Sequence, residues 1–556
     1  MNLVFLCIGI VLTAVEGKLL GVQLLSRHGN RAPNPEVFLM CPNEISNVRR
    51  YLDMNISLEA VTGRGMQQMY ELGEFTRQTY VAPPPGSAFA GFMKPYYSAA
   101  EVYMHAVGTQ RTLQSAIAFA HGVFPPGTAP ADYNKGYLPD PVPVYSVPAG
   151  EDNLLEARKS GCKRRLARDM AEWDASTGRD LYSHAGYREL IATMSRLCGF
   201  ELDDTSKSSA DEFDLEDAIK VVSDAFVFDL YEHFPMHRGL SEKLIYQFSS
   251  LAAEQLQGRL YSTADQRTYM AGDLPLVFLA NFRRSIKRQM ARIKQQQQKP
   301  PSVAGMKPVS GDQWSAMDLE LQTSEDNSDD FVNLDAVSAL WNANQHYIDS
   351  VKPLGKMNMR FWSFHGHREI LYAIGAMLDL NFTAAHPGLG MPRGVLPPAA
   401  TIFFELHQDD AATADSDPSA LFFVRIKLWT PCEALHGHAA HLYETGTSIF
   451  EVCPSVTIQA KGCATDCPFT TFQAIILDQI AATGCWQELC HFNSNAARLN
   501  KLEIANGSLT HALIFVSICS VVLLGVVVWL YRWSVRHSAH EYHEIPGFSD
   551  EREPDD

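Results

Sequence analysis

The segment 24–33, Leu-Leu-Ser-Arg-His-Gly-Asn-Arg-Ala-Pro, constrains the fold more than any other part of the chain. It begins inside an apolar run, residues 19–25, which is typical of a buried β-strand. The glycine and prolines that come next predict a loop. Arg27, His28 and Arg31 therefore leave the carboxyl end of a strand together, and in open α/β sheets that edge is where ligands bind.

These side chains have the chemistry of a phosphate site. Two guanidinium groups can grip a phosphate dianion through paired, charge-assisted hydrogen bonds. The imidazole of His28 stands between them in the sequence, where it can attack phosphorus, and Gly29 lets the backbone approach closely. A basic loop that pairs with nearby carboxylates is the alternative, and the complete motif favours the phosphate site over it.

Residues 27–33 resemble the signature of the histidine acid phosphatases, the two-domain branch of the histidine phosphatase superfamily. The resemblance implies an α/β fold, with a Rossmann-like three-layer sandwich core and an inserted all-α cap domain. This chain adds one predicted C-terminal transmembrane helix. The resemblance also implies hydrolysis of phosphomonoesters, with His28 as the nucleophile and a phosphohistidine intermediate. We expect no cofactor and no metal, because arginines neutralise the charge of the phosphate.

A second predicted strand, residues 102–107, is followed by a helix with Arg111 in its first turn. Backbone N–H groups and the helix dipole favour an anion at that place, so a cation there indicates an anion beside it. Residues 110–116 are similar to the family segment whose arginine binds phosphate. The resemblance thus adds Arg111 to Arg27 and Arg31 as a phosphate ligand. One departure precedes it, since acid phosphatases of this type often carry arginine where this chain has His105.

The segment 357–364 predicts a third strand, and His367, Arg368 and Glu369 follow it. This segment resembles the second motif of the family in its H-x-E form. The resemblance implies that His367 is catalytic and binds phosphate, and that Glu369 protonates the leaving alcohol. Arg368 occupies the position of the acid in the alternative H-D form. We expect a bound phosphate to raise the pKa of Glu369, and we take His365 as the next candidate donor.

The length of 556 residues predicts two folded lobes plus appendages. The net charge of −17 argues against a partner that is a nucleic acid, because binding one would need a basic face. Helical periodicity predicts the cap, and a low-complexity, charge-rich stretch inside it predicts a disordered loop. The predicted boundaries are a signal peptide at 1–17, the core at 18–150 and 341–500, the cap at 151–340 with a loop at 287–335, a stalk at 501–511, a transmembrane helix at 512–531 and a cytoplasmic tail at 532–556.

Residues 512–531 carry no charge and are long enough to span a bilayer. With the predicted signal peptide they indicate a single-pass type I membrane protein whose catalytic part is extracellular or luminal. The acidic working range of the resembled family suits an endosome or lysosome, and the cell surface is the other expected location. Three sequons predict glycosylation at Asn55, Asn381 and Asn506.

The predicted tail contains a short sorting pattern. Tyr542 and Ile545 have the Tyr-x-x-apolar spacing that clathrin adaptors read as an extended peptide. This predicts a clathrin adaptor as a partner, beside the membrane and a small phosphomonoester substrate. A homodimer is left open.

Cysteine usage fits an oxidising compartment. Of the 11 cysteines, Cys7 lies in the predicted signal peptide and Cys519 in the predicted span, which leaves nine. An odd number leaves at least one thiol unpaired. Spacing and resemblance imply two disulfides, Cys463–Cys467 and Cys162–Cys490.

Two other functions stay open. The H-x-E form favours a phytase-like phosphatase of inositol polyphosphates, and a basic run could line its pocket: Lys159, Lys163, Arg164 and Arg165. A catalytically inactive surface receptor is the second alternative, because Arg368 and His105 both depart from the family pattern. The intact set of His28 and three arginines argues against the receptor.

Overall fold

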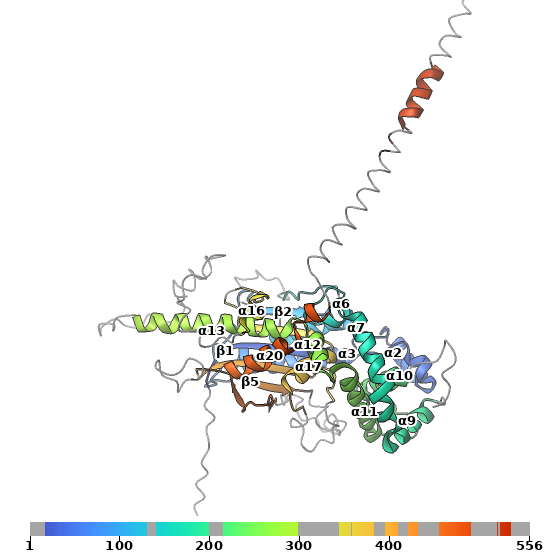
Figure 1. Ribbon diagram of the computed structural model, residues 1–556, viewed down its shortest axis with the longest axis horizontal. Helices are drawn as coiled ribbons and strands as arrows, with labels where there is room; N and C mark the ends of the chain where they lie inside the picture. Colours follow the sequence, from blue (N-terminus) through green and yellow to red (C-terminus); the bar gives the residue numbers. More distant parts are fainter. Residues whose placement is uncertain are drawn as a thin grey trace, which may run out of the picture. The chain divides into compact units, whose positions relative to one another are not determined.

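The computed structural model describes residues 17–129, 141–148, 150–199, 215–298, 344–356, 358–382, 395–409, 421–431 and 455–490, with residues 517, 520 and 523–534 near the C-terminus. Residues 1–491 form one compact unit and residues 492–556 a second one. The candidate site lies in the first unit, whose labelled elements Figure 1 shows.

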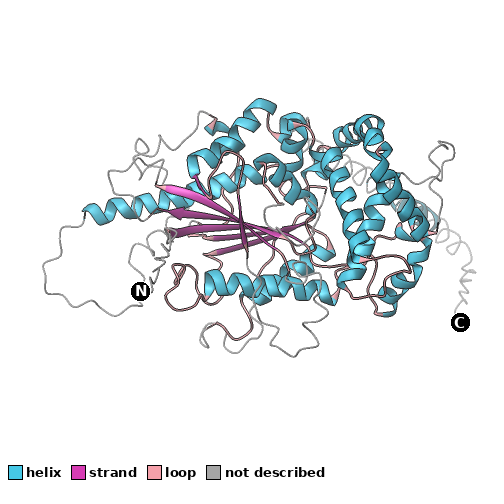
Figure 2. Ribbon diagram, turned by 90° about the horizontal axis from the view of Figure 1, so that it is seen from below, coloured by secondary structure: helices cyan, strands magenta, loops and turns pink. Residues whose placement is uncertain are grey.

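Within the described residues, a mixed seven-stranded sheet forms the centre of the first unit (Figure 2). Its strands are β1 (Lys18–Arg27), β2 (Val102–Ala106), β3 (Phe361–Gly366), β4 (Thr401–Gln408), β5 (Phe422–Trp429), β6 (Val456–Ile458) and β7 (Asp466–Pro468). The spatial order is β2-β3-β1-β4-β5-β6, and β7 pairs with β5. β1 and β2 run parallel to β3, whereas β4 and β5 are antiparallel to their neighbours. The predicted α/β class is confirmed.

The register between β1 and β3 brings the two predicted motifs to one edge of the sheet. Ser26 pairs with His365 and Arg27 with Gly366. The backbone N–H of His28 then donates to the carbonyl of Gly366 at 2.9 Å. Both motifs therefore leave adjacent parallel strands at their carboxyl ends, as the sequence predicted.

Helices cover both faces of the sheet, which gives three layers (Figure 2). One face carries α3 (Gly63–Thr76) and α4 (Gln110–Val123), and the other carries α13 (Leu274–Gln298), α17 (Arg368–Leu378) and α20 (Phe469–Thr483). The ring of Phe75 in α3 packs against Phe403, and that of Phe278 in α13 packs against Phe404. Successive residues of a strand point to opposite faces, so neighbouring phenylalanines of β4 anchor helices on both sides.

A helical cap adjoins the carboxyl edge. Its helices are α7 (Lys163–Trp173), α8 (Arg179–Ser183), α9 (Ala185–Cys198), α10 (Leu215–Tyr231) and α11 (Glu242–Tyr261), with the short α1 (Val37–Met40), α2 (Ile45–Asp53), α6 (Ala157–Ser160) and α12 (Ala264–Ala271) beside them. Further short helices are α16 (Gln345–Asp349) and α21 (Trp486–Leu489). Val37 of α1 and Val48 of α2 share an apolar cluster with Phe226 of α10 and Phe248 of α11. The cap core is thus built from two separate parts of the chain.

The helix α13 corrects one predicted boundary. The disordered loop was placed from residue 287 onward, but the helix continues to Gln298. Ile286 and Met290 are buried on its inner side, and Arg284 donates to the carbonyl of Gly355 at 2.9 Å. Lysine, arginine and glutamine are good helix formers, so a run of them that looks like a linker extends the helix instead. The rest of the predicted loop lies outside the described residues.

Three disulfides lie within the described residues. The predicted pairs Cys463–Cys467 and Cys162–Cys490 are both confirmed. A third disulfide, Cys41–Cys198, was not predicted and ties the end of α1 to the end of α9. Cys485 is a free cysteine, in agreement with the expected unpaired thiol.

Several predicted features fall outside the described residues: the signal peptide up to residue 16, the sequon asparagine Asn506, and Tyr542 and Ile545 of the tail. The other two sequon asparagines, Asn55 and Asn381, are exposed. Among the described residues, we find no helix whose length and apolar character would let it cross a membrane. Part of the predicted span, residues 512–516, 518–519 and 521–522, is outside the description.

Candidate active site

Close backbone packing holds the loop after β1 in place. A Cβ atom on Gly29 would lie 2.0 Å from the carbonyl oxygen of Gly65 in α3, so only glycine fits. The N–H of Gly29 donates to Ser115 Oγ at 3.1 Å, and the N–H of Asn30 donates to Gln68 Oε1 at 2.9 Å. Helices α3 and α4 therefore fix the path of the loop that carries His28.

The imidazole of His28 is buried, with 4% of the residue exposed, and has a defined tautomer. Its Nδ1 lies 2.8 Å from the carbonyl oxygen of Gly29. A carbonyl can only accept, so Nδ1 carries the hydrogen and Nε2 keeps its lone pair. Burial, followed by the nearby His367 and Arg27, holds the pKa of His28 well below its usual value of 6.5. The site thus contains a neutral imidazole with a free nucleophilic nitrogen.

Two buried arginines flank this imidazole. The guanidinium of Arg31 lies 4.6 Å from the ring centre of Phe228 in α10, and that of Arg27 lies 5.9 Å from it. Arg27 Nη1 donates to the carbonyl of Leu396 at 2.6 Å, and Arg31 Nη2 donates to Asn34 Oδ1 at 2.6 Å. Burial lowers the pKa of each arginine to about 10, which leaves both charged at acidic and neutral pH.

Arg111 completes the set of three arginines. It lies in the first turn of α4, where its Nη1 is 3.9 Å from Glu59 Oε2. Within the described residues, the Nε atoms of Arg27, Arg31 and Arg111 are all buried without a hydrogen-bond partner. Buried donors are normally satisfied, so these three atoms point to an anion that binds among them.

His367 comes from the second motif and caps α17. Its ring lies 5.4 Å from the ring of His28, edge to face. On its other side, His367 Nε2 is 3.3 Å from Glu156 Oε1, a buried carboxylate just before α6. Glu156 was not predicted as a site residue. Nothing in its local sequence distinguishes it from other acids of the cap.

Glu369 lies at the site, where two cations approach its carboxylate. Its Oε1 is 3.4 Å from Arg158 Nη1 and 3.9 Å from Lys220 Nζ. Burial favours the neutral acid, but Arg158 and Lys220 outweigh it and hold the pKa of Glu369 well below 4.5. The lowered pKa belongs to the protein alone, and the expected upward shift beside a bound phosphate stays a prediction. The two cations that lower the pKa of Glu369 come from the cap, so the local sequence around Glu369 does not reveal them.

Arg368 turns toward the cap. It forms a bidentate pair with Asp224 of α10, at 2.6 Å and 3.0 Å. The position that holds an acid in the H-D form is thus occupied by an ion pair between core and cap.

The structure removes His365 as a substitute proton donor. Its ring is fully buried in the sheet layer, between Ser26 Oγ at 2.7 Å and Ser363 Oγ at 3.2 Å. Burial lowers the pKa of His365 to about 3. The proposal of His365 as a donor was wrong because the residue precedes the strand end and points into the core. His105 is also buried, with Nε2 3.8 Å from Asp152 Oδ2.

The cap helix α10 contacts the site through residues spaced four apart. Lys220 approaches Glu369, Asp224 pairs with Arg368, and Phe228 lies under the arginines. Glu232, one residue beyond the helix, accepts from Asn30 Nδ2 at 2.7 Å. Residues four apart share one face of a helix, and this stripe is missed when only the apolar face of α10 is considered.

Comparison with known proteins agrees with this geometry. Residues 18–216 match the family profile described as "Histidine phosphatase superfamily (branch 2)". This part of the chain is similar to that superfamily. The match includes His28 and the three arginines, and it ends before the second motif of the chain.

Part of the chain is also similar in sequence to curated acid phosphatases, and its fold is similar to that of a solved structure. The chain is 35% identical to mouse testicular acid phosphatase over 162 residues, which are 28% of this chain and 34% of the relative. It is 34% identical to rat lysosomal acid phosphatase over 143 residues, 26% of this chain and 30% of that protein. The alignments thus span about a third of these relatives. A phytase from Klebsiella sp. ASR1 shares the fold, with a TM-score of 0.51, 15% identity, and coverage of 84% of this chain and 97% of that one.

Proposed function

We propose that this protein is an acid phosphatase that hydrolyses phosphomonoesters through a phosphohistidine. The observation that carries the proposal is the neutral imidazole of His28, whose Nε2 keeps its lone pair, together with three nearby arginines whose Nε donors have no partner among the described residues. Nε2 attacks phosphorus, the bond between phosphorus and the ester oxygen breaks, and the alcohol leaves with a proton. Water then attacks the phosphohistidine and releases phosphate and the imidazole.

The other site residues have supporting roles in this proposal. Arg27, Arg31, Arg111 and His367 hold the oxygens of the phosphoryl group, where charge is spread in the transition state. Preorganised donors in a water-poor site stabilise that charge without reorganisation. These arginines neutralise the charge of the phosphoryl group, as a metal ion does in other phosphatases.

The low pKa of His28 predicts the pH dependence of the reaction. A neutral imidazole is the nucleophile, and activity is lost only when it becomes protonated. Because the pKa of His28 is well below 6.5, kcat/KM for 4-nitrophenyl phosphate should persist as pH falls through 6.5. A pH–rate profile from about pH 3 to 8 checks this. Loss of half the activity near pH 6.5 would show that His28 has an ordinary pKa.

We propose Glu369 as the proton donor for poor leaving groups. Its low pKa in the free protein means that the protonated fraction rises only as pH falls well below 4.5, unless a bound phosphate shifts it upward. Glu369→Gln should reduce kcat for an alkyl phosphate by about 10²–10⁴-fold. The same change should affect 4-nitrophenyl phosphate much less, because its leaving group needs little protonation. An equal, small effect on both substrates would assign the donor to another residue.

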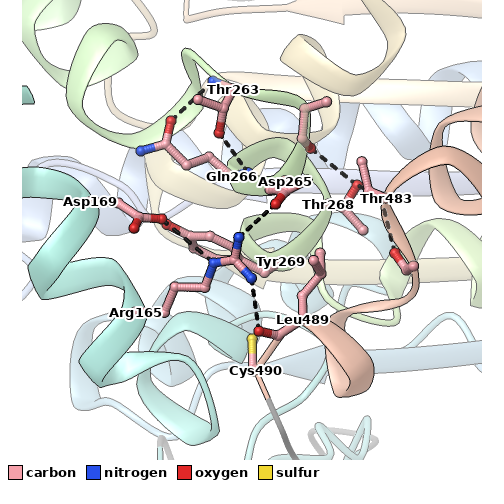
Figure 3. A network of polar contacts seen from close by, with 12 residues as sticks. Arg165, Asp169, Thr263, Asp265, Gln266, Thr268, Tyr269, Thr483, Leu489 and Cys490 are labelled. Atoms are coloured by element: carbon pink, nitrogen blue, oxygen red, sulfur yellow. Dashed lines mark hydrogen bonds and ion pairs between the residues drawn. The ribbon is translucent and has the colours of Figure 1, made fainter.

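The phytase-like alternative loses most of its predicted basic pocket. Figure 3 shows Arg165 held by Asp265, at 2.6 Å, and by the carbonyl of Leu489, beside the disulfide cysteine Cys490. Lys163 and Arg164 are exposed on α7. Only Lys159 is joined to site residues, through Glu156 at 3.0 Å. A preference for inositol polyphosphates therefore has less support than a general phosphomonoesterase, and the complete site disfavours an inactive receptor.

The location is also part of the proposal. The uncharged segment 512–531 and the N-terminal apolar run support a membrane-anchored enzyme, and the relatives include a lysosomal acid phosphatase. We propose a lysosomal or extracellular site of action, with Tyr542 as a sorting residue for a clathrin adaptor. Microscopy of the full chain and of Tyr542→Ala tests this, and unchanged endosomal location would exclude Tyr542.

The proposed activity has a simple test. The full-length protein, purified in detergent, should hydrolyse 4-nitrophenyl phosphate at acidic pH. Absence of turnover with every phosphomonoester offered would instead favour a binding role for this site.

A further inference from the structure

Three elements meet at the carboxylate of Glu369. Arg158 comes from α6, Lys220 from α10 and Glu369 from α17, and both cations approach the same oxygen, Oε1. Tyr261 of α11 donates to the backbone carbonyl of Glu369 at 2.6 Å and leaves the carboxylate to the two cations. His367 and Arg368, from the same segment as Glu369, add further positive character when charged.

The cations around Glu369 exceed the carboxylates. Arg158 also lies 3.4 Å from Glu156 Oε2, and Lys159 lies 3.0 Å from the same atom. Three cations therefore share two carboxylates at this side of the site. Arg368 and Asp224 do not change this count, because they form an ion pair with each other and add no net charge. A surplus of positive charge beside the phosphate ligands favours an additional anion.

The two lysines of this group are open to solvent. The side chain of Lys220 is 35% exposed and that of Lys159 is 46% exposed, whereas those of Arg158 and Glu369 are 17% and 12% exposed. An incoming anion can thus reach the ammonium groups without any opening of the fold. The pair between Lys220 and Glu369 is long, at 3.9 Å, so Lys220 donates no hydrogen bond to that carboxylate.

We infer that Lys220 and Arg158 bind a second acidic group on the alcohol part of the substrate, and that this releases Glu369 to act as proton donor. The inference rests on the proposed phosphatase function and names its substrate class: phosphomonoesters whose alcohol carries one carboxylate. When that group pairs with the two cations, Glu369 takes a proton from water and passes it to the leaving oxygen. It takes a proton from the water that attacks the phosphohistidine and returns that proton to solvent when the products leave, so Glu369 is again ionised and the cycle balances.

This arrangement couples specificity to catalysis. With a neutral alcohol Glu369 stays largely paired and ionised, so only the small protonated fraction can give a proton to the departing alkoxide. An acidic alcohol gains binding and acid catalysis together. The effect should be confined to poor leaving groups, since these alone need the proton.

Two alkyl phosphates that differ by one carboxylate provide the test: propyl phosphate and 3-phosphooxypropanoate. The full-length protein should prefer the carboxylated ester in kcat/KM by about tenfold or more, the order expected for one charge-assisted hydrogen bond. Lys220→Met should reduce kcat/KM for 3-phosphooxypropanoate by about tenfold and increase it for propyl phosphate, because Glu369 then protonates more readily. Lys243→Met, at an exposed lysine of α11, should change neither.

Opposite responses of the two esters are a result that a merely structural role of Lys220 would not produce. Equal losses on both esters, or no preference in the unmodified protein, would overturn the inference. If Lys220→Met also loses 4-nitrophenyl phosphate turnover, Lys220→Arg decides instead, because it should keep the preference and its loss would overturn the inference. Failure of the proposed function appears separately, as absence of 4-nitrophenyl phosphate turnover by the unmodified protein.

Discussion

Replacing His28 with alanine should lower kcat by about 10⁴-fold or more, as the loss of a nucleophile does in other enzymes with covalent intermediates. The imidazole keeps a lone pair on Nε2, and Arg27, Arg31 and Arg111 are its electrostatic neighbours. The neighbouring arginines cannot substitute, because a guanidinium stays protonated and has no lone pair to offer. Steady-state turnover of 4-nitrophenyl phosphate measures the loss.

His121→Ala is the matched control for this experiment. His121 lies on the exposed side of α4, away from the phosphate ligands, and its replacement should leave kcat within about twofold. A His28→Ala protein that keeps a tenth of the wild-type rate would place the nucleophile elsewhere.

Gly29→Ala should both destabilise the protein and inactivate it. The added Cβ would lie 2.0 Å from the carbonyl oxygen and 2.5 Å from the carbonyl carbon of Gly65. Both are backbone atoms at the start of α3, so no side-chain rotation relieves the clash. Overpacking of this kind costs about 1–3 kcal/mol and occasionally more. A shift of about 1 Å in the loop that carries His28 should cost about 10²-fold in kcat/KM.

Gly63→Ala is the control for Gly29→Ala. Its Cβ would meet no atom within 4 Å, although Gly63 lies at the start of the same helix. The free energy of unfolding of this variant should equal that of the unmodified protein or exceed it by about 0.4–1 kcal/mol. Its unfolding temperature should therefore be the same or slightly higher. Thermal unfolding and kcat/KM of both variants check the prediction. Equal behaviour of Gly29→Ala and Gly63→Ala would mean that the loop does not pack on α3 as described.

The part of the site that follows directly from strands was predictable from the sequence. The buried residues of β1 and β3 form continuous runs because helices cover both faces of the sheet. Parallel pairing then places the residues after Arg27 and after Gly366 at one edge. His28 and His367 therefore come together for reasons that the apolar pattern contains.

The environment of Glu369 was not predictable in the same way. Its neighbours Arg158 and Lys220 lie in cap segments far away in the sequence, and only tertiary packing shows that they reach it. The sequence places a carboxylate near the phosphate site, but its pKa depends on those cations. The disulfide Cys41–Cys198 was missed for a related reason, because the connectivity of several cysteines does not follow from their spacing.

The end of α13 shows the limit of composition as a guide. A glutamine-rich run can be a linker or the exposed end of a helix, and the two differ in whether apolar residues continue on one face. Met290 continues the buried face of Ile286 beyond residue 287, where the polar residues predicted a loop. The helix propensity of the polar run allows it to stay helical, and the packing of α13 on the sheet holds the helix in place.

Covalent labelling tests the central claim most directly. The full-length protein is mixed with a phosphomonoester labelled in its phosphate, quenched rapidly without acid, and digested into peptides. We predict label on the peptide that contains His28, labile in acid and stable in alkali, and none on the His28→Ala protein. Turnover with no labelled protein, or acid-stable label on a peptide without His28, would contradict the phosphohistidine mechanism.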